Sequence, residues 1–579
     1  MAFYSDIPRP EHPNPQFFRK NWVNLNGKWN FEMDPSGTGV DRGLIDGKAY
    51  SREIQVPFCM ESELSGLNFK DFCKCVWYHR VVDIPEDFLC TEKQVVLHIG
   101  ASDYRTTVYV NGRKVGYHIG GYVSFSFDIT DFLNKESSRC DIVICAEDDN
   151  RSRKQASGKQ SLEYHSKGCY YTRTTGIWQT VWLESVPKAH ISSIRCLPNL
   201  TEQTLTVEAR AANANGKKLT AYAYWDGQLV GASECFVCGE QGVFIMRLSQ
   251  LHLWEIGSGG LYDLRLELED DCVSSYFGMR EVRAENGVFY LNGKPVFQRL
   301  VLDQGFYPEG IYTAPSEADL IADIRRSMDM GFNGARLHEK IFEQRFLYYC
   351  DRMGYMVWEE HANWGLDLSS GDAWKGFIPE WNEIVLRDFN HPAIVGWCPL
   401  NEVQYDRDED FIRYVSTFTK QLDPTRPVIV TSGWNHVNGL NDFEDWHDYD
   451  QNPETMRTRY EDVVRGIAVT SNTVLHEPLF PNFISEYGGI RWDIKTQEQN
   501  AWGYGVAPKS EQEFKARFKG LADALMDNPH ICGFCYTQLT DVEQEVNGLY
   551  TYDRKAKFAP DFFKQVLSRE AAVEKNNKK

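Results

Sequence analysis

The sequence predicts a multidomain protein of mixed α/β and all-β class, with two β-sandwiches followed by a (β/α)8 barrel. Short alternating strands separated by turn residues fill the first half of the chain, and from residue 284 strands alternate with amphipathic helices. A chain of 579 residues is also too long for a single core. We expect a jelly-roll sandwich over residues 1–185, an immunoglobulin-like sandwich over 186–283 and the barrel over 284–579.

The first domain shows strand-like alternation with almost no helical periodicity. Its strand candidates include VWYHRVVDI, QVVLHIG, RTTVYVNG, SFSFDIT and CDIVICA. The Asn111-Gly112 dipeptide predicts a tight hairpin, because a type I′ turn requires positive φ at both central residues. In the second domain about seven short strands follow at regular spacing, which is typical of an immunoglobulin-like sandwich. That segment has no dense polar or aromatic cluster, and we interpret it as a spacer.

Eight strand candidates alternate with helices in the third domain, and eight is the number that closes a barrel. They are VFQRLVLD, FNGARLH, YMVWEE, IVGWCPLNE, PVIVTSGW, FEDWHDY, NFISEYG and ICGFCYTQL. Helices are expected between them, for example over 316–331 and from Ser510 onward, where serine begins each helix as a cap. Active sites of such barrels lie at the carboxyl ends of the strands, so residues there share one cleft.

Charge and composition exclude several kinds of partner. The formal net charge of −20 disfavours nucleic acid and anionic membrane surfaces, since both are bound through Lys and Arg. The chain has no apolar run long enough for a membrane span and no signal-like segment at its N-terminus, so we expect a cytoplasmic protein. Aromatic residues make up 13% of the chain, which suits either stacking on sugar rings or aromatic β-sheet cores.

The fifteen cysteines lie mostly alone in apolar segments, and we interpret them as reduced small hydrophobes. Cys235 and Cys238 form a single Cys-x-x-Cys without a second pair or a histidine at zinc spacing, so we do not expect a metal or redox site there. No cofactor is expected.

Two glutamates end predicted strands of the barrel. Glu402 follows the apolar run that begins at Ile394, and Glu486 ends the strand in PNFISEYGG. Any strand can end on Glu, but two carboxyls at one barrel rim indicate acid/base and nucleophilic chemistry on a glycosidic bond, at a separation of about 5 to 5.5 Å for a retaining enzyme. We predict Glu402 as general acid/base and Glu486 as nucleophile. Asn401 is predicted to hydrogen-bond the substrate 2-hydroxyl.

Further polar and aromatic residues lie at other predicted strand ends. Arg336 is expected to keep the pKa of Glu486 low through its charge, although an ordinary salt bridge within the barrel is the alternative. The remaining candidates for substrate binding are His338, Trp358, Glu360, Trp434, His447, Tyr449 and Tyr536, together with Asp303, Asp541 and Glu543. Spacing does not say which of them touches sugar, and a structural role is the alternative for each histidine.

The motifs of nearly the whole chain resemble those of glycoside hydrolase family 2, the retaining exo-glycosidases that include β-galactosidase and β-glucuronidase. They are LNGKWNFEMD, VPFCMESELSG, VYVNGRKVGYHIGGYVSFSFDIT, TGIWQTVWLE, LNGKPVFQRLVLDQG, WCPLNE and ISEYGG. By this resemblance the first sandwich is the sugar-binding domain, Asn401-Glu402 matches the acid/base motif and Glu486 matches the nucleophile. Arg336 and His338 match the arginine and histidine of the second strand. A glycoside or oligosaccharide is the expected partner, and a homo-oligomer is possible.

Departures from the family pattern bear on the sugar. The large β-galactosidases carry two further β-domains after the barrel, and their motif after the first strand contains histidine and glutamate where this chain has LVLDQGFYPEG. We therefore expect a less characterised branch of the family. In β-glucuronidases a stretch resembling Asn-Lys-Lys-Gly binds the substrate carboxylate, whereas this chain, aligned on Gly548, has Glu545 and Asn547.

Glucuronides are therefore expected to be poor substrates, because a buried carboxylate beside a second carboxylate and without a cation is costly. We predict a neutral glycone, with β-D-galactose first, α-L-arabinopyranose next and α-L-arabinofuranose third. The alternatives are a β-glucuronidase or another β-glycosidase of the family and, in a different class, a carbohydrate-binding protein that has lost activity. The presence of both glutamates favours an enzyme.

Overall fold

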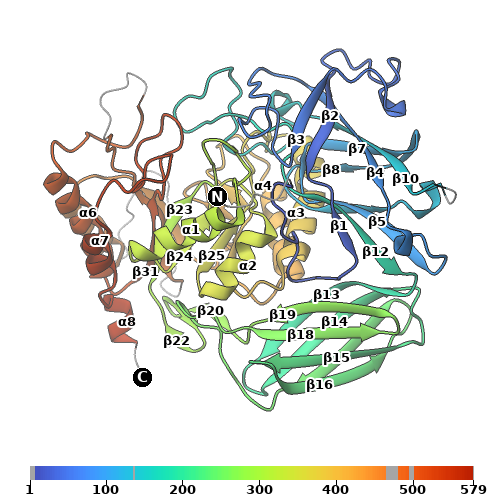
Figure 1. Cartoon of the computed structure of the whole chain (residues 1–579). Helices are drawn as coiled ribbons and strands as arrows, with labels where there is room; N and C mark the ends of the chain where they lie inside the picture. The colour runs from blue at the N-terminus through green and yellow to red at the C-terminus, as the bar shows by residue number, and fades with distance from the viewer. Residues whose placement is uncertain (1–6, 135–136, 438, 465–479, 494–500, 578–579) are drawn as a thin grey trace.

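The computed structural model describes residues 7–134, 137–437, 439–464, 480–493 and 501–577, and it has the three-part architecture that the sequence predicts (Figure 1). The first sandwich lies at the upper right of the view, the second below it, and the barrel beside both. The barrel is thus contacted by two β-domains.

The first sandwich consists of two sheets with the strand orders β1-β12-β5-β9 and β3-β2-β4-β10-β7-β8, and a small sheet β11-β6. Apolar side chains from the two larger sheets form one core. The predicted hairpin is present, since Asn111 and Gly112 join β7 to β8 with φ angles of 49° and 73°. The strands are β1 (Trp22–Asn24), β2 (Gly27–Met33), β3 (Arg52–Val56), β4 (Cys75–Asp83), β5 (Lys93–Ile99), β6 (Ser102–Asp103), β7 (Arg105–Val110), β8 (Arg113–Ile119), β9 (Phe125–Asp128), β10 (Arg139–Glu147), β11 (Gly176–Ile177) and β12 (Val181–Pro187).

The second sandwich has sheets of three and four strands, in the orders β13-β14-β17 and β16-β15-β18-β19. Burial alternates along β14 and β17, as expected where one face of a sheet packs on a core and the other faces water. Cys235, Cys238 and the other cysteines of the chain are free thiols. The strands are β13 (His190–Asn199), β14 (Thr204–Ala212), β15 (Lys218–Trp225), β16 (Gln228–Phe236), β17 (Gln241–Arg247), β18 (Tyr262–Leu268) and β19 (Asp271–Phe277).

Parallel strands form the barrel, in which seven make the continuous sheet β26-β25-β24-β23-β31-β30-β29. The eighth position is taken by β28, a strand of only two residues where the sequence predicted one over 427–434, and it pairs with β27, the continuation of β26. Gly433 then donates its N–H to Asp445 at 2.7 Å and links β28 to β29. The strands are β23 (Gln298–Asp303), β24 (Gly334–Leu337), β25 (Met356–Glu360), β26 (Ile394–Cys398), β27 (Leu400–Asn401), β28 (Thr431–Ser432), β29 (Glu444–Asp448), β30 (Asn482–Gly488) and β31 (Ile531–Thr537).

Amphipathic helices surround these strands, and their buried residues join the barrel core. At the start of α6 the Ser510 hydroxyl accepts the Glu513 N–H at 3.2 Å, as its sequence predicts for a cap. A small sheet of β20 (Val282–Glu285), β21 (Val288–Leu291) and β22 (Lys294–Pro295) precedes the barrel and packs Phe289 into the same core. The helices are α1 (Glu317–Asp329), α2 (Gln344–Met353), α3 (Asp372–Asp388), α4 (Glu409–Leu422), α5 (Pro453–Val464), α6 (Glu511–Met526), α7 (Pro560–Leu567) and α8 (Ala572–Asn576).

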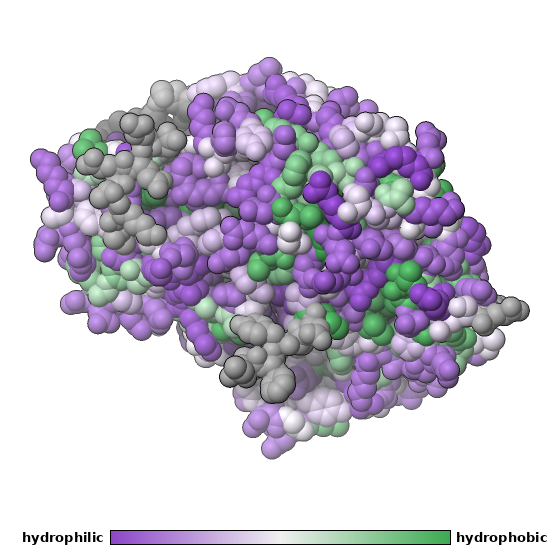
Figure 2. Space-filling view, turned by 45° about the horizontal axis from the view of Figure 1, so that its top comes forward, coloured by the Kyte–Doolittle hydropathy of each residue, from purple (hydrophilic) through white to green (hydrophobic). Residues whose placement is uncertain are grey.

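The surface is mostly hydrophilic on the face that Figure 2 shows, with small separate hydrophobic areas. Within the described ranges, no helix combines the length and the apolar character that a membrane crossing requires.

A buried arginine ties the two sandwiches together. Arg19 donates to Asp271 of β19 at 2.8 and 2.9 Å and to Glu184 of β12 at 3.3 Å. Its side chain is 6% exposed, and it is a cation that both buried carboxylates share, although Glu184 also has His98 Nε2 at 3.5 Å.

We predict that Arg19→Met lowers the free energy of unfolding of the sandwich pair by about 3–5 kcal/mol, because it removes the cation that the buried Asp271 and Glu184 share. Urea denaturation followed by tryptophan fluorescence measures this. Lys28→Met is the matched control, since the Lys28–Glu53 pair is exposed and its loss is expected to cost less than about 1 kcal/mol. Equal midpoints for the two variants would contradict the prediction.

Candidate active site

Glu402 and Glu486 meet at the carboxyl ends of the barrel strands. Glu402 directly follows β27, and Glu486 lies in β30. His447 of β29 stands between them, with Nδ1 2.7 Å from Glu402 Oε1 and Nε2 3.4 Å from Glu486 Oε1. The nearest oxygens of the two carboxylates are within 4.8 Å of one another. The two groups are thus close enough to act on opposite faces of one sugar carbon.

Irregular backbone geometry sets the direction of both glutamate side chains. The pairing of β30 shifts register on both sides at this point, between Ile484 and Glu486 against β29 and between Ile484 and Tyr487 against β31. Such a bulge re-aims a side chain that regular alternation would direct elsewhere. Glu402 has a φ of 46°, in the left-handed region that a residue with a Cβ rarely adopts. Strain of this kind persists where the surrounding structure enforces it, often at functional sites.

Arg336 of β24 organises the floor of the site. Its guanidinium donates to Glu486 Oε1 at 2.7 Å, to Asn401 Oδ1 at 2.7 Å and to Glu360. The residue is 1% exposed. Burial alone would raise the pKa of Glu486, but the charges of His447, Arg336, His338 and Lys159 outweigh burial and hold it well below its usual value. Glu486 is therefore ionised.

Glu360 and His338 complete this charge network. His338 Nδ1 lies 2.7 Å from Glu360 Oε1, and the Glu339 N–H donates to the same oxygen at 3.0 Å. Burial opposes ionisation of Glu360, yet Arg336 and His338 lower its pKa to about 2. Asn401 has an unsatisfied hydrogen-bond donor, because its Nδ2 is buried and has no partner among the described residues.

Aromatic rings line one side of the pair. The Tyr449 hydroxyl donates to Glu486, and its ring stacks on Tyr504 with centroids 3.4 Å apart. Gly489 permits this arrangement, because its φ is 58° and a Cβ there would lie 2.3 Å from the Tyr504 ring. Trp434 lies on another side, 5.5 Å from the His447 ring and half-buried. The sequence prediction included Tyr449 and Trp434 and missed Tyr504, which does not end a strand.

Two aromatic candidates do not reach the cleft. Trp358 is 0% exposed and packs in the barrel interior against Phe443 and Phe483, with Nε1 donating to Gln298. It lies two residues before the end of β25, and that places it one layer below the rim. Tyr536 is also 0% exposed and contacts Phe518 of α6, on the outer side of β31. The prediction that these two bind substrate is wrong.

Three acidic candidates have structural partners instead. Asp541 pairs with Lys557 at 2.6 Å, and Glu543 accepts the Thr172 N–H at 3.0 Å. Asp303 accepts the Gly305 N–H at 2.9 Å, and burial together with Asp323 raises its pKa to about 6. None of these contacts includes Glu402 or Glu486.

A segment of the first sandwich covers part of the rim. Residues 155–173 reach the loops after β25 and β31, where Ser157 N–H donates to Trp364 O at 2.7 Å and Gln544 Nε2 donates to Gly168 O at 2.7 Å. The Tyr171 hydroxyl of this segment donates to Glu545, and the charge of Lys159 interacts with those of Glu402 and Glu486. Sequence analysis missed Lys159, since only tertiary packing brings it to the barrel.

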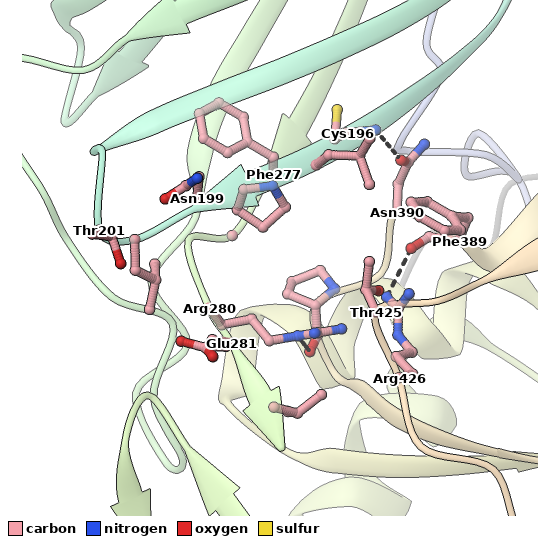
Figure 3. Close-up of a pocket in the computed structure, with 16 residues that line it drawn as sticks. Cys196, Asn199, Thr201, Phe277, Arg280, Glu281, Phe389, Asn390, Thr425 and Arg426 are labelled. Carbon is pink, nitrogen blue, oxygen red and sulfur yellow. Dashed lines mark hydrogen bonds between the residues drawn. The ribbon is translucent and has the colours of Figure 1, made fainter. Parts of the chain in front are cut away.

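The cavity in Figure 3 lies elsewhere. It has a volume of about 400 Å³ between the second sandwich and the barrel, beside Phe389 and Arg426. These residues precede β26 and β28, so the cavity is at the amino ends of the strands, opposite the usual active-site face. Arg280 and Arg426 donate to backbone carbonyls there, for instance to Pro392 O at 2.9 Å and Phe389 O at 2.7 Å. This cavity is a gap at a domain interface whose cations are already hydrogen-bonded.

We predict that Glu360→Gln removes a pH-dependent part of stability. The pKa of Glu360 is about 2 in the folded protein against 4.5 for a free side chain, so its contribution is present above pH 4.5 and is lost as pH falls toward 2. The variant is expected to unfold with about 3 kcal/mol less free energy at pH 7 and to approach the wild type near pH 3. Denaturation at both pH values measures this. Glu285→Gln, at an exposed position, is the control, and an equal gap at both pH values would contradict the prediction.

Comparisons with known proteins match this architecture along most of the chain. Three family models align in succession: "Glycosyl hydrolases family 2, sugar binding domain" over residues 22–187, "Glycosyl hydrolases family 2" over 189–280 and "Glycosyl hydrolases family 2, TIM barrel domain" over 282–490.

Individual relatives are distant. The chain is 26% identical over 442 residues to a putative β-glucuronidase of Formosa agariphila, covering 71% of this chain and 50% of that protein. It is 26% identical over 399 residues to a β-galactosidase of Thermoanaerobacter pseudethanolicus, covering 66% and 51%. The chain thus spans about half the length of these two relatives. The fold is similar to that of a β-glucuronidase from Ruminococcus gnavus, with a TM-score of 0.79 at 18% identity over 96% of this chain and 99% of that one.

Proposed function

The chain belongs to glycoside hydrolase family 2, and from this premise we propose that it is a retaining exo-glycosidase that releases a neutral sugar from the non-reducing end of a glycoside. The observation that carries the proposal is the separation of the carboxylates, whose nearest oxygens are within 4.8 Å. Inverting enzymes need about 6.5–9.5 Å between the carboxyl groups to admit a water molecule, whereas retaining enzymes hold them about 5–5.5 Å apart.

The environments of the two glutamates support different roles. Glu486 is 3% exposed, bound by Arg336 and Tyr449, and held ionised, as a nucleophile requires. The Glu402 side chain is 15% exposed and has a single histidine as side-chain partner, so it is accessible to a leaving group and to water. Glu402 is then the acid/base and Glu486 the nucleophile.

The reaction follows as a double displacement. The Glu486 carboxylate bonds to the anomeric carbon while the Glu402 acid gives its proton to the departing glycosidic oxygen. The Glu402 carboxylate next takes a proton from water, whose oxygen attacks the same carbon and releases Glu486. Arg336 and Tyr449 hold Glu486 in position, and the free Nδ2 of Asn401 is available to the 2-hydroxyl. The second step thus restores both glutamates to their starting state.

Residues around Glu545 support a neutral glycone. Glu545 is 2% exposed, and its carboxylate accepts hydrogen bonds from Tyr171 at 2.5 Å and from Asn547 at 3.0 Å. Burial raises its pKa to about 7. Above that pH a substrate carboxylate next to this group meets like charge. The order of preference remains β-D-galactoside, then α-L-arabinopyranoside, then α-L-arabinofuranoside.

A β-glucuronidase is the second candidate, because of the relative named so and because Lys159 adds a cation near the site. A panel of p-nitrophenyl glycosides separates the two. We expect the galactoside to have a kcat/KM at least about tenfold above that of the glucuronide. The reverse order would favour the glucuronidase, and no turnover of any glycoside would favour a binding protein without activity.

We predict that Glu486→Gln abolishes nearly all turnover with an unchanged melting temperature, because the amide cannot form the covalent intermediate. A 2-fluoro-glycoside is expected to label Glu486 in the wild type, as peptide mass mapping can verify. Glu409→Gln, at an exposed carboxylate, is the control and should retain full activity. Labelling of another carboxylate would refute the assignment.

We predict that Glu402→Ala loses at least about a hundredfold in rate on glycosides with poor leaving groups and much less on those with good ones. Azide should restore turnover on the latter and yield a β-glycosyl azide from a β-glycoside, because it attacks the glycosyl-enzyme without needing a base. Equal losses for both kinds of leaving group, without azide rescue, would remove Glu402 from the acid/base role.

A further inference from the structure

The segment 155–173 carries an ammonium group to the catalytic pair. Lys159 is 5% exposed, and its Nζ lies 3.7 Å from the centre of the Trp364 ring. Ser157 and Gly158 fix the backbone next to it, donating to Trp364 O at 2.7 and 3.1 Å. The position of Lys159 is therefore built into the contact between the first sandwich and the barrel.

This ammonium has no polar partner of its own. Across the described ranges, the Lys159 side chain takes part in no hydrogen bond and no ion pair, and the Trp364 ring is its nearest charge-stabilising contact. Burial alone would lower the pKa of Lys159, but Cys169, Glu402, Glu486 and Glu545 raise it above its usual value. The group is charged and lies in a largely buried residue, so water or a ligand has to supply its hydrogen bonds.

Glu545 is the acceptor that faces the same region. Burial raises its pKa, while the charge of Lys159 acts in the opposite direction. Tyr171 and Asn547 each donate one hydrogen bond to a different oxygen of its carboxylate, and each oxygen retains a further lone pair. Tyr171 relates the two groups, because its N–H donates to Lys159 O at 2.8 Å and its hydroxyl donates to Glu545. Among the described residues Lys159 and Glu545 form no direct ion pair.

We propose that Lys159 and Glu545 together bind neighbouring hydroxyl groups of a neutral glycone, and that this pairing selects against uronic acids. An ammonium only donates hydrogen bonds and a carboxylate only accepts them, whereas a hydroxyl does both. A diol therefore satisfies both groups. A uronate that reached Lys159 would meet Glu545. This inference rests on the proposed function, since it assigns the residues that hold the neutral sugar.

The test uses Lys159→Met and Glu545→Gln in the full-length protein, with Lys154→Met as the matched control. Lys154 lies in the same region, but its side chain is 69% exposed and pairs with Asp372. We expect Lys159→Met to lower kcat/KM on the p-nitrophenyl galactoside by about 10- to 100-fold, the effect of one hydrogen bond to a charged group. Lys154→Met is expected to stay within about twofold of the wild type.

Deoxy-galactosides give a readout that a purely structural role would not change. For one deoxy substrate, the kcat/KM of the wild type should fall by about 10- to 100-fold relative to the parent galactoside. The kcat/KM of Lys159→Met should hardly fall further, because the partner of the missing hydroxyl is already absent. Each comparison is a ratio of kcat/KM values for two substrates measured on one protein preparation, so a smaller folded fraction cancels from the ratio. Glu545→Gln should raise the ratio of glucuronide to galactoside turnover, since it removes the repulsive charge.

Each contrary result is distinct. If the wild type cleaves neutral glycosides but every deoxy substrate costs the wild type and Lys159→Met equally, the hydroxyl pairing is wrong and the proposed function stands. If Lys159→Met lowers kcat/KM more for the glucuronide than for the galactoside, Lys159 binds the substrate carboxylate and the pairing is wrong. A wild type that cleaves only glucuronide overturns the proposed function and the pairing with it.

Discussion

The ion-pair network of Arg336 is the interaction on which the site depends. One guanidinium, 1% exposed, contacts Glu486, Glu360 and Asn401, which come from three other segments of the barrel. A buried pair of this kind adds little net stability, yet removal of the arginine leaves buried carboxylates without compensation. The network therefore fixes positions and charge states more than it stabilises the fold. It keeps Glu486 ionised within 4.8 Å of Glu402, the carboxyl group that we propose as acid/base.

The barrel alone does not complete the site. The first sandwich contributes the segment 155–173, which contacts the loops after β25 and β31 through Trp364 and Gln544. This segment lies along one side of the site, and a barrier on one side is compatible with the exo action that we propose. The second sandwich makes no described contact with Glu402 or Glu486, and Arg19 links it to the first sandwich through Asp271 and Glu184.

Local signals in the sequence predicted much of this structure. The Asn111-Gly112 hairpin and the Ser510 cap are set by neighbouring residues, so they are visible without tertiary information. Glu402 and Glu486 were identified because an apolar strand that ends on a carboxylate marks the rim of a barrel. The short β28 was not foreseen, because an apolar run indicates burial without giving the extent of strand pairing.

Tertiary packing decided what the sequence did not reveal. Trp358 and Tyr536 were predicted at the rim because their strands end there. The position of a residue along its strand and the direction of its side chain also matter, and these two side chains lie in the core. Lys159 is about 240 residues from Glu402 and about 330 from Glu486 in the chain, and no local pattern relates them. Long-range contacts of this kind follow from how domains dock, which periodicity does not specify.

The stereochemistry of the first product tests the central claim most directly. If Glu486 forms a covalent intermediate within reach of Glu402, hydrolysis of a β-glycoside proceeds by two inversions and releases the β-anomer first. Proton NMR of the anomeric region during the first minutes of turnover distinguishes the two products before mutarotation mixes them. The account predicts that the β-anomer signal appears first and the α-anomer follows slowly. Initial release of the α-anomer would mean a single displacement by water, which the close approach of Glu402 and Glu486 does not accommodate.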